Sequence, residues 1–285
     1  MVNLVEPARG KSEGDLVTDN GGDWKESFRP DIPSPARMYD YYLGGKDHYP
    51  ADREAAEQVL SAAPDIRLGA RANREFLQRA VRFLAGEAGI RQFLDIGTGL
   101  PTAGNVHEVA QSVAPDSRIV YVDNDPVVKV HALDLLHGVD GTTFIKHDLR
   151  EPDSILDDPE LRRVIDTSKP TAVLLLAILH FLSDDERPRE IVERLLGPFP
   201  SGSYLVLTHG TADSRPQVHA AAKVYDKATS RGFARSHDQV NLFLTGLEPV
   251  DPGLVWVPQW RPGPDTALTS EPERSIFYGA VARKP

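Results

Sequence analysis

The chain has 285 residues, of which 40% are hydrophobic and 26% charged, and a formal net charge of -10. This length and composition fit one globular α/β domain with extensions and exclude a disordered chain, while the acidic balance argues against nucleic acid and anionic membrane surfaces as partners. The sequence contains no cysteine, which excludes disulfides, thiolate metal ligands and cysteine nucleophiles and fits a cytoplasmic protein.

The first segment, residues 1–30, is rich in Gly, Asp, Glu and Lys and has no sustained apolar period, so we expect a flexible tail. Acidic residues interrupt it throughout, which argues against a secretory signal. The longest purely apolar run, Ala172 to Leu179, is far shorter than the roughly 20 residues of a membrane helix. It predicts a buried strand, and we expect no membrane partner.

Three helices are predicted next, in an N-terminal extension over residues 31–88. The first begins after Ser34, which can cap it, and ends at Gly44-Gly45. The other two are predicted over residues 51–61 and 70–86, the latter with one apolar stripe.

From residue 89 to residue 285 short apolar runs alternate with helical stretches, which predicts a Rossmann-like, mostly parallel sheet with helices on both faces. The predicted strands are residues 92–96, 118–122, 142–145, 171–178 and 203–208, and the predicted helices are 106–112, 126–136, 184–196, 216–229 and 236–244. Two last runs, 254–260 and 275–282, predict an antiparallel hairpin. We therefore expect an α/β domain with a seven-stranded sheet.

A glycine loop follows the first strand in the run Phe93-Leu94-Asp95-Ile96-Gly97-Thr98-Gly99. Glycines permit close approach of a ligand, and a helix predicted to start near Thr102 would present free amides to it. Tight turns also use glycine for geometry alone. Asp95 sharpens the prediction, because an acid at this strand end suits the ammonium of a methionine moiety better than a pyrophosphate.

Acidic residues also end the next two strands. Asp123, followed by Asn124, is our candidate acceptor for both ribose hydroxyls, and Asp148 is our candidate acceptor for an adenine amino group that Leu149 would contact. For each acid taken alone, a helix cap or an exposed loop carboxylate is the favoured interpretation. The three acids together with the glycine loop predict an adenosyl ligand at the carboxyl ends of the strands.

This constellation resembles the class I methyltransferases that use S-adenosylmethionine (SAM), except that Leu100 and Pro101 follow Gly99 where a third glycine is common. The resemblance extends to an actinobacterial family of SAM-dependent methyltransferases. The segments that carry it are Pro35 to Asp47 (PARMYDYYLGGKD), Asp52-Arg53, Ala70 to Arg74 (ARANR), FLDIGTGLPT and YVDNDPVV. The resemblance implies SAM as cofactor, methyl transfer as the reaction, and Leu-Pro as a family trait.

The fourth strand ends near His180, which could be a general base, a donor that positions the acceptor, or a capping group. His209 has the same readings, with loop packing favoured. We predict no metal, because no HExxH motif or cluster of His and Asp is present.

Aromatic and charged residues gather around Gly44-Gly45, and Tyr39, Tyr42, Lys46 and Asp47 are our candidate substrate contacts. This segment could fold over the pocket as a lid, or it could be a surface hairpin whose tyrosines pack on the sheet. The family resemblance favours the lid. Arg71 and Arg74 could reach the lid acids or the cofactor carboxylate, or could form a solvated face.

The predicted function is methyl transfer from SAM to a small-molecule acceptor that the sequence does not identify. Two alternatives are a SAM-binding regulatory protein without transfer and a nicotinamide-dependent oxidoreductase. Against the latter, Asp95 would lie close to negative charge and Thr102 occupies the third position of the dinucleotide glycine pattern.

Overall fold

The computed structural model describes residues 28–285, so nearly all of the tail predicted over residues 1–30 lies outside the described part. A single sheet has the strand order β3-β2-β1-β4-β5-β8-β6, with β7 paired to β8. The strands are β1 (Gln92–Ile96), β2 (Arg118–Asp123), β3 (Thr142–Lys146), β4 (Ala172–Leu176), β5 (Tyr204–Gly210), β6 (Glu248–Pro249), β7 (Val255–Trp256) and β8 (Phe277–Arg283).

Strands β1 to β5 are parallel, and β8 runs antiparallel to β5. The predicted Rossmann-like fold with a C-terminal antiparallel hairpin is confirmed. The sheet has eight strands where we expected seven, because β6 and β7 are two-residue strands that both pair with β8. The predicted strand 254–260 is wrong beyond Trp256, where Val257–Gln259 forms a 3₁₀ turn.

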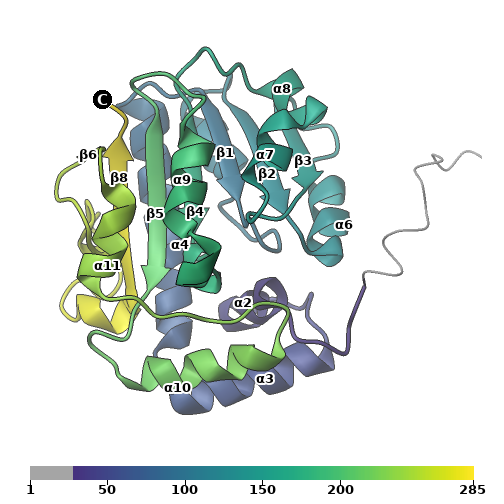
Figure 1. Ribbon diagram of the computed structural model, residues 1–285, viewed down its shortest axis with the longest axis vertical. Coiled ribbons are helices and arrows are strands. Elements are labelled where there is room, and N and C mark those ends of the chain that lie inside the picture. The colour runs from purple at the N-terminus through teal and green to yellow at the C-terminus, as the bar shows by residue number, and fades with distance from the viewer. Residues whose placement is uncertain (1–27) are drawn as a thin grey trace, which may run out of the picture.

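Helices cover both faces of the sheet (Figure 1). Neighbouring strand residues point to opposite faces, so Phe93 and Leu94 belong to two separate apolar cores. The core around Phe93 is closed by α4 (Ile66–Gly86), α5 (Val106–Val113) and α6 (Pro126–Leu135), and the core around Leu94 by α7 (Pro152–Asp157), α8 (Pro159–Val164), α9 (Pro188–Leu196) and α11 (His237–Asn241). This double cover explains why the strands read as continuous apolar runs.

A third layer lies across the carboxyl ends of the parallel strands (Figure 1). It consists of α2 (Pro35–Leu43), α3 (Pro50–Ala62) and α10 (Gln217–Val224), which share a small apolar core of their own. Met38 and Val59 are fully buried in it. The N-terminal extension therefore packs with α10, a helix from much later in the chain, over the edge of the sheet where a ligand is expected.

Some helix predictions need correction. Helix α4 begins at Ile66, four residues before the predicted start. The predicted helix 184–196 is interrupted at Arg187, which has a left-handed φ of 52° before Pro188 opens α9. Helices α7 and α8 were not predicted, because each is only six residues long and carries no full apolar period.

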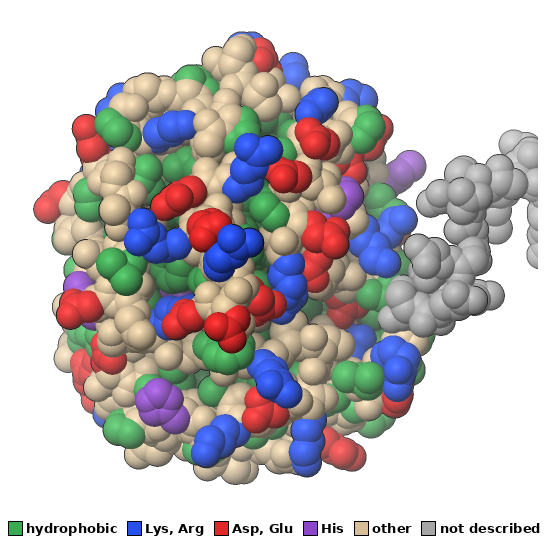
Figure 2. Space-filling view, viewed as in Figure 1, with side chains coloured by type: hydrophobic (Ala, Val, Ile, Leu, Met, Phe, Trp, Pro, Cys, Tyr) green, Lys and Arg blue, Asp and Glu red, His purple; other side chains and the backbone are tan. Residues whose placement is uncertain are grey.

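Acidic and basic side chains intermingle on the face of the molecule shown in Figure 2. None of the helices between residues 28 and 285 combines the length and hydropathy of a membrane-spanning helix.

Candidate active site

One pocket opens at the carboxyl edge of the sheet, between the strand ends and the layer of α2 and α10. It brings together every residue that the sequence predicted for the cofactor. These are Asp95, Gly97, Thr98, Gly99, Asp123, Asn124, Asp148 and Leu149. They come from the ends of three parallel strands, which meet at one edge because of the strand order β3-β2-β1.

The glycine loop has left-handed backbone at Gly97 (φ 73°) and Gly99 (φ 66°). A Cβ at Gly97 would lie 2.6 Å from Cγ1 of Ile178, whereas a Cβ at Gly99 would meet nothing within 4 Å. Gly97 is therefore required for packing as well as for φ. The helix that follows begins at Val106, after Asn105, so the prediction that it starts near Thr102 and presents its amides beside the glycines is wrong.

The Asp123 carboxylate is held in place by two backbone amides. Its Oδ2 accepts a hydrogen bond from the Gly99 amide at 2.8 Å, and its Oδ1 accepts one from the Asp125 amide at 2.9 Å. Burial raises the pKa of Asp123 to about 6, although these bonds oppose the shift. Each oxygen keeps an unused lone pair, so the ionised carboxylate can still accept two hydroxyl donors.

Asp95 is also buried, and burial raises its pKa to about 6. A hydrogen bond from Thr98 and the positive charge of Arg74 oppose this shift by lowering the pKa. Asn73 and Arg74, on α4, line the same pocket. The Asn73 amide donates to the Tyr39 hydroxyl at 2.9 Å, and this hydroxyl donates to the Ala70 carbonyl, which fixes the orientation of the amide.

The Asn73 Oδ1 atom is buried and has no hydrogen-bond partner among the described residues. An unpaired buried acceptor that lines the same pocket as a carboxylate suits a ligand with several N–H donors, such as the ammonium of a methionine moiety. The pocket therefore fits the predicted cofactor at this end. Arg71, one of the two arginines considered from sequence, is exposed and is not among the pocket-lining residues.

At the end of β3, Asp148 accepts hydrogen bonds from the Asn124 side chain at 2.7 Å and from the Arg150 amide at 2.9 Å. Arg150 lines the pocket and its Nε donates to Glu186 at 2.5 Å. Sequence reasoning missed Arg150, because its role depends on the distant Glu186 rather than on a local pattern.

His180 lies in the 3₁₀ turn after β4 and lines the pocket. Its Nδ1 accepts a hydrogen bond from the Gly210 amide at 3.3 Å. Burial and the nearby charge of Arg235 lower its pKa to about 3. The ring is therefore neutral at physiological pH and, with Nδ1 as acceptor, we assign its proton to Nε2.

His209 has both ring nitrogens engaged: Nδ1 donates to the Gly210 carbonyl at 2.8 Å and Nε2 accepts from Arg235 at 3.0 Å. The side chain is fully buried, and it is not among the residues that line the pocket. These contacts agree with the packing role favoured from sequence.

The four candidate substrate contacts separate into two pairs. Tyr39 and Tyr42 line the pocket, whereas Lys46 and Asp47 are exposed and do not line it. Gly44 ends α2 with a left-handed φ of 87°, which turns the following residues away to the surface.

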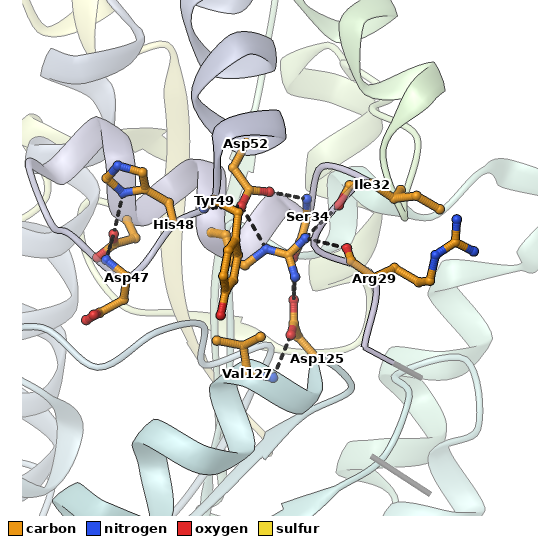
Figure 3. Close-up of polar contacts among 11 residues, drawn as sticks. Arg29, Ile32, Ser34, Asp47, His48, Tyr49, Asp52, Asp125 and Val127 are labelled. Carbon is orange, nitrogen blue, oxygen red and sulfur yellow. Dashed lines mark hydrogen bonds and ion pairs between the residues drawn. The ribbon is translucent and has the colours of Figure 1, made fainter. Parts of the chain in front are cut away.

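The start of α2 is joined to the β2 end by a buried polar cluster (Figure 3). The Ser34 hydroxyl donates to Asp125 at 2.5 Å, so this side chain does not form the helix cap that the sequence predicted. Arg37 pairs with Asp52 at 2.9 Å and lies 3.7 Å from Asp125. Asp125 immediately follows Asn124 of the predicted cofactor site, so the helical extension contacts that site directly.

Between residues 28 and 285, no three His, Asp or Glu side chains come close enough together to hold a metal ion.

Comparisons with known proteins agree with the geometry. The model of the family described as S-adenosyl methyltransferase matches residues 23–285. A crystal structure of a DUF574 family protein from Streptomyces avermitilis is 48% identical, covers 90% of this chain and 100% of its own, and superposes with a TM-score of 0.87. A candidate methyltransferase from Thermobifida fusca is 40% identical over 89% of this chain and 95% of its own, with a TM-score of 0.84.

A more distant structure, an O-methyltransferase family protein from Burkholderia thailandensis, shares the fold alone. It is 15% identical, covers 79% of this chain and 61% of its own, and has a TM-score of 0.51. A comparison with proteins of curated function finds no match.

Proposed function

Because the chain belongs to the S-adenosyl methyltransferase family, and is a SAM-dependent methyltransferase, we propose that the pocket at the carboxyl edge of the sheet is where it binds SAM and methylates a small molecule. One observation carries this proposal: three strand-end carboxylates and the unpaired Asn73 oxygen line the same pocket. The family assignment replaces the two alternatives considered from sequence, the SAM-binding regulator and the nicotinamide-dependent oxidoreductase.

The cofactor's two polar ends suit two parts of this pocket. Asp123 would accept the ribose hydroxyls, while Asp95 and Asn73 would accept the methionine ammonium and Arg74 would pair with the methionine carboxylate. Asp148 and Leu149, at the end of β3, would contact the adenine. SAM supplies a methyl group that its sulfonium already activates, so the protein's task is to place the acceptor in line and exclude water.

The N-terminal extension over residues 31–88 would act as the lid of this site. Tyr39 and Tyr42 line the pocket from α2, as does Ser34 immediately before this helix, and Arg37 and Ser34 join this segment to Asp125. Residues 89–285 would form the SAM-binding domain. The layer of α2, α3 and α10 over the strand ends favours an acceptor small enough to fit beneath it.

Isothermal calorimetry of the purified protein with SAM and S-adenosylhomocysteine tests the first step. We expect one site per chain for both ligands. Incubation with methyl-labelled SAM and a metabolite extract then tests transfer, with labelled small-molecule product as the expected result. Absence of calorimetric binding would contradict the proposed site, and label found only in macromolecules would contradict the proposed acceptor class.

A further inference from the structure

The pocket divides into a charged half and an uncharged half. All Asp, Glu, Lys and Arg residues among the described residues that line it lie at the ends of β1, β2 and β3 or on α4. They are Arg74, Asp95, Asp123, Asp125, Asp148 and Arg150. The lining contributed by the ends of β4 and β5, by β8 and α10, and by residues 225–234 contains none. Since the charged half matches the polar groups of SAM, the uncharged half is left for the acceptor.

Aromatic rings form a continuous wall in the uncharged half. The ring centroids of His180 and Phe181 are 4.4 Å apart, those of Phe181 and Tyr225 are 5.4 Å apart, and those of His180 and Phe277 are 5.9 Å apart. Val218 and Ala221, on α10, add aliphatic surface. A lining of this kind favours a flat, largely apolar ring as the acceptor.

Two hydrogen-bond donors interrupt this apolar lining. The first is Nε2–H of His180, for which no described residue provides a partner. The second comes from the Tyr42 and Tyr225 hydroxyls, which lie 3.0 Å apart, so that one donates to the other and one hydrogen remains available. Hydrogen-bond donors in an otherwise apolar lining favour a ligand oxygen atom that carries negative charge.

No described side chain that lines the uncharged half is suited to remove a proton near neutral pH. The Nδ1 lone pair of His180, the ring's basic site, already accepts a hydrogen bond from the Gly210 amide. Burial together with the charge of Arg235 also lowers the pKa of this ring to about 3. His209, which packs beside His180, accepts from Arg235 and has a pKa well below its usual value because of burial. Burial raises the pKa of Tyr225 to about 12, so this residue is a neutral phenol.

Building on the proposed function, we propose that the uncharged half binds a small aromatic molecule whose acidic hydroxyl has already lost its proton to solvent. In this arrangement His180 donates a hydrogen bond to the resulting oxygen anion. An oxygen lone pair of the acceptor forms the new O–CH₃ bond while the S–CH₃ bond pair returns to sulfur. The negative oxygen and the positive sulfonium become neutral together. Their attraction is strong in a site shielded from water, which offsets burial of the anion.

Two substitutions of His180 test whether this residue acts as a hydrogen-bond donor or as a general base. His180→Gln keeps an N–H donor but removes any basic nitrogen, whereas His180→Phe removes both. The probes are 4-nitrophenol and a series of less acidic substituted phenols, each with SAM. We expect their methyl ethers as products. His180→Phe should lower kcat/KM for the phenol by roughly 10- to 100-fold, mainly through a higher KM, because the lost donor stabilises the bound phenolate, whose charge disappears during transfer. His180→Gln should lower kcat/KM by about tenfold or less.

The pH dependence gives a second readout. If the acceptor binds ionised, the pH of half-maximal kcat/KM follows the pKa of each phenol. The absorbance of bound 4-nitrophenol reports its ionised form directly. A half-maximal pH that is the same for all phenols would overturn the proposal, as would a His180→Gln variant as slow as His180→Phe, or methylation of the matching anilines but of no phenol.

Calorimetry with SAM on each variant distinguishes this inference from the proposed function. SAM binding without methylation of any phenol overturns the acceptor class alone. Failure of the unsubstituted protein to bind SAM overturns the proposed site itself.

Discussion

Nη1 of Arg37 lies 3.7 Å from Oδ2 of Asp125, and this contact joins the N-terminal extension to the end of β2. Both side chains are buried, with exposed fractions of 2% and 8%. Asp125 in turn donates its amide to Asp123, the candidate ribose acceptor. The N-terminal extension and the proposed cofactor site are therefore joined by a continuous series of ion pairs and hydrogen bonds.

Arg37→Ala should destabilise the protein. It leaves the fully buried Asp52 without its charge partner, and breaking a buried pair typically costs about 3–5 kcal/mol. Arg29→Ala is the matched control, because the Arg29–Asp31 pair is more than half exposed and such pairs contribute about 0–1 kcal/mol. Urea unfolding of both variants measures the difference. Equal midpoints would mean that the cluster around Asp52 does not hold the extension in place.

Asp123→Ala should weaken SAM binding. The substitution removes the proposed ribose acceptor and also releases the Gly99 amide, which the carboxylate holds at 2.8 Å. Loss of charged hydrogen bonds worth about 1.5–3 kcal/mol predicts an affinity roughly 10- to 100-fold lower. Asp116→Ala, at an exposed carboxylate on the surface, is the control and should bind SAM normally. Unchanged affinity in Asp123→Ala would move the ribose contact elsewhere.

Gly97→Ala and Gly99→Ala should differ in their effects although both change one glycine of the same loop. Both glycines have positive φ, so each substitution carries backbone strain of about 1 kcal/mol or more. Only at Gly97 would the added Cβ also lie 2.6 Å from Ile178. We expect Gly97→Ala to lower the melting temperature and SAM affinity more than Gly99→Ala, as thermal unfolding and calorimetry can show. The reverse order would contradict the loop geometry.

SAM affinity should rise with pH between about 5 and 7. Burial raises the pKa of Asp95 and of Asp123 to about 6, and both must be ionised to accept donors from the cofactor. Bound SAM favours the ionised forms, so affinity weakens as pH falls through 6, by up to about tenfold per carboxyl at pH 5. Calorimetry at several pH values measures this slope, and Asp95→Asn should flatten it. A pH-independent affinity would contradict the proposed contacts.

Asp95 and Asp123 also make the stability of the ligand-free protein depend on pH, but in the opposite direction from SAM affinity. Because their pKa values are higher in the folded than in the unfolded chain, the folded protein binds more protons between about pH 4 and 6. Their contribution to the free energy of unfolding therefore decreases as pH rises through that range. Buried His180 and His209 oppose this trend, since their lowered pKa values remove stability as pH falls below 6.5.

The parallel sheet and the strand-end acids could be predicted from sequence because both depend on local order. Apolar runs identify the strands, and the residue after each run must lie at the carboxyl edge. Asp95, Asp123 and Asp148 therefore converge for the same reason that the sheet forms.

The proposed acceptor side of the pocket was predicted only in part, at Tyr42 and His180, because the rest is assembled from distant segments. Tyr225 meets Tyr42 across 183 residues of sequence, and Asn73 is one polar residue on an amphipathic helix with no local mark of its role. Asp40 shows that a residue of a recognisable motif can instead have a structural role. It belongs to the motif that carried the resemblance, yet its carboxylate accepts from the Asp47 amide and His48 and shapes the turn at Gly45.

The division of the pocket into charged and uncharged halves has a consequence for the evolution and engineering of this enzyme. The uncharged half is lined by the ends of β4 and β5, by β8, by α10 and by residues 225–234, whereas Arg74 and the ends of β1, β2 and β3 supply the charged half. Substitutions in α10 and in residues 225–234, which carry none of the proposed cofactor contacts, are therefore expected to change which molecule is methylated while the groups proposed to hold the methyl donor stay the same. A library confined to these two segments would explore new acceptors on a constant donor site.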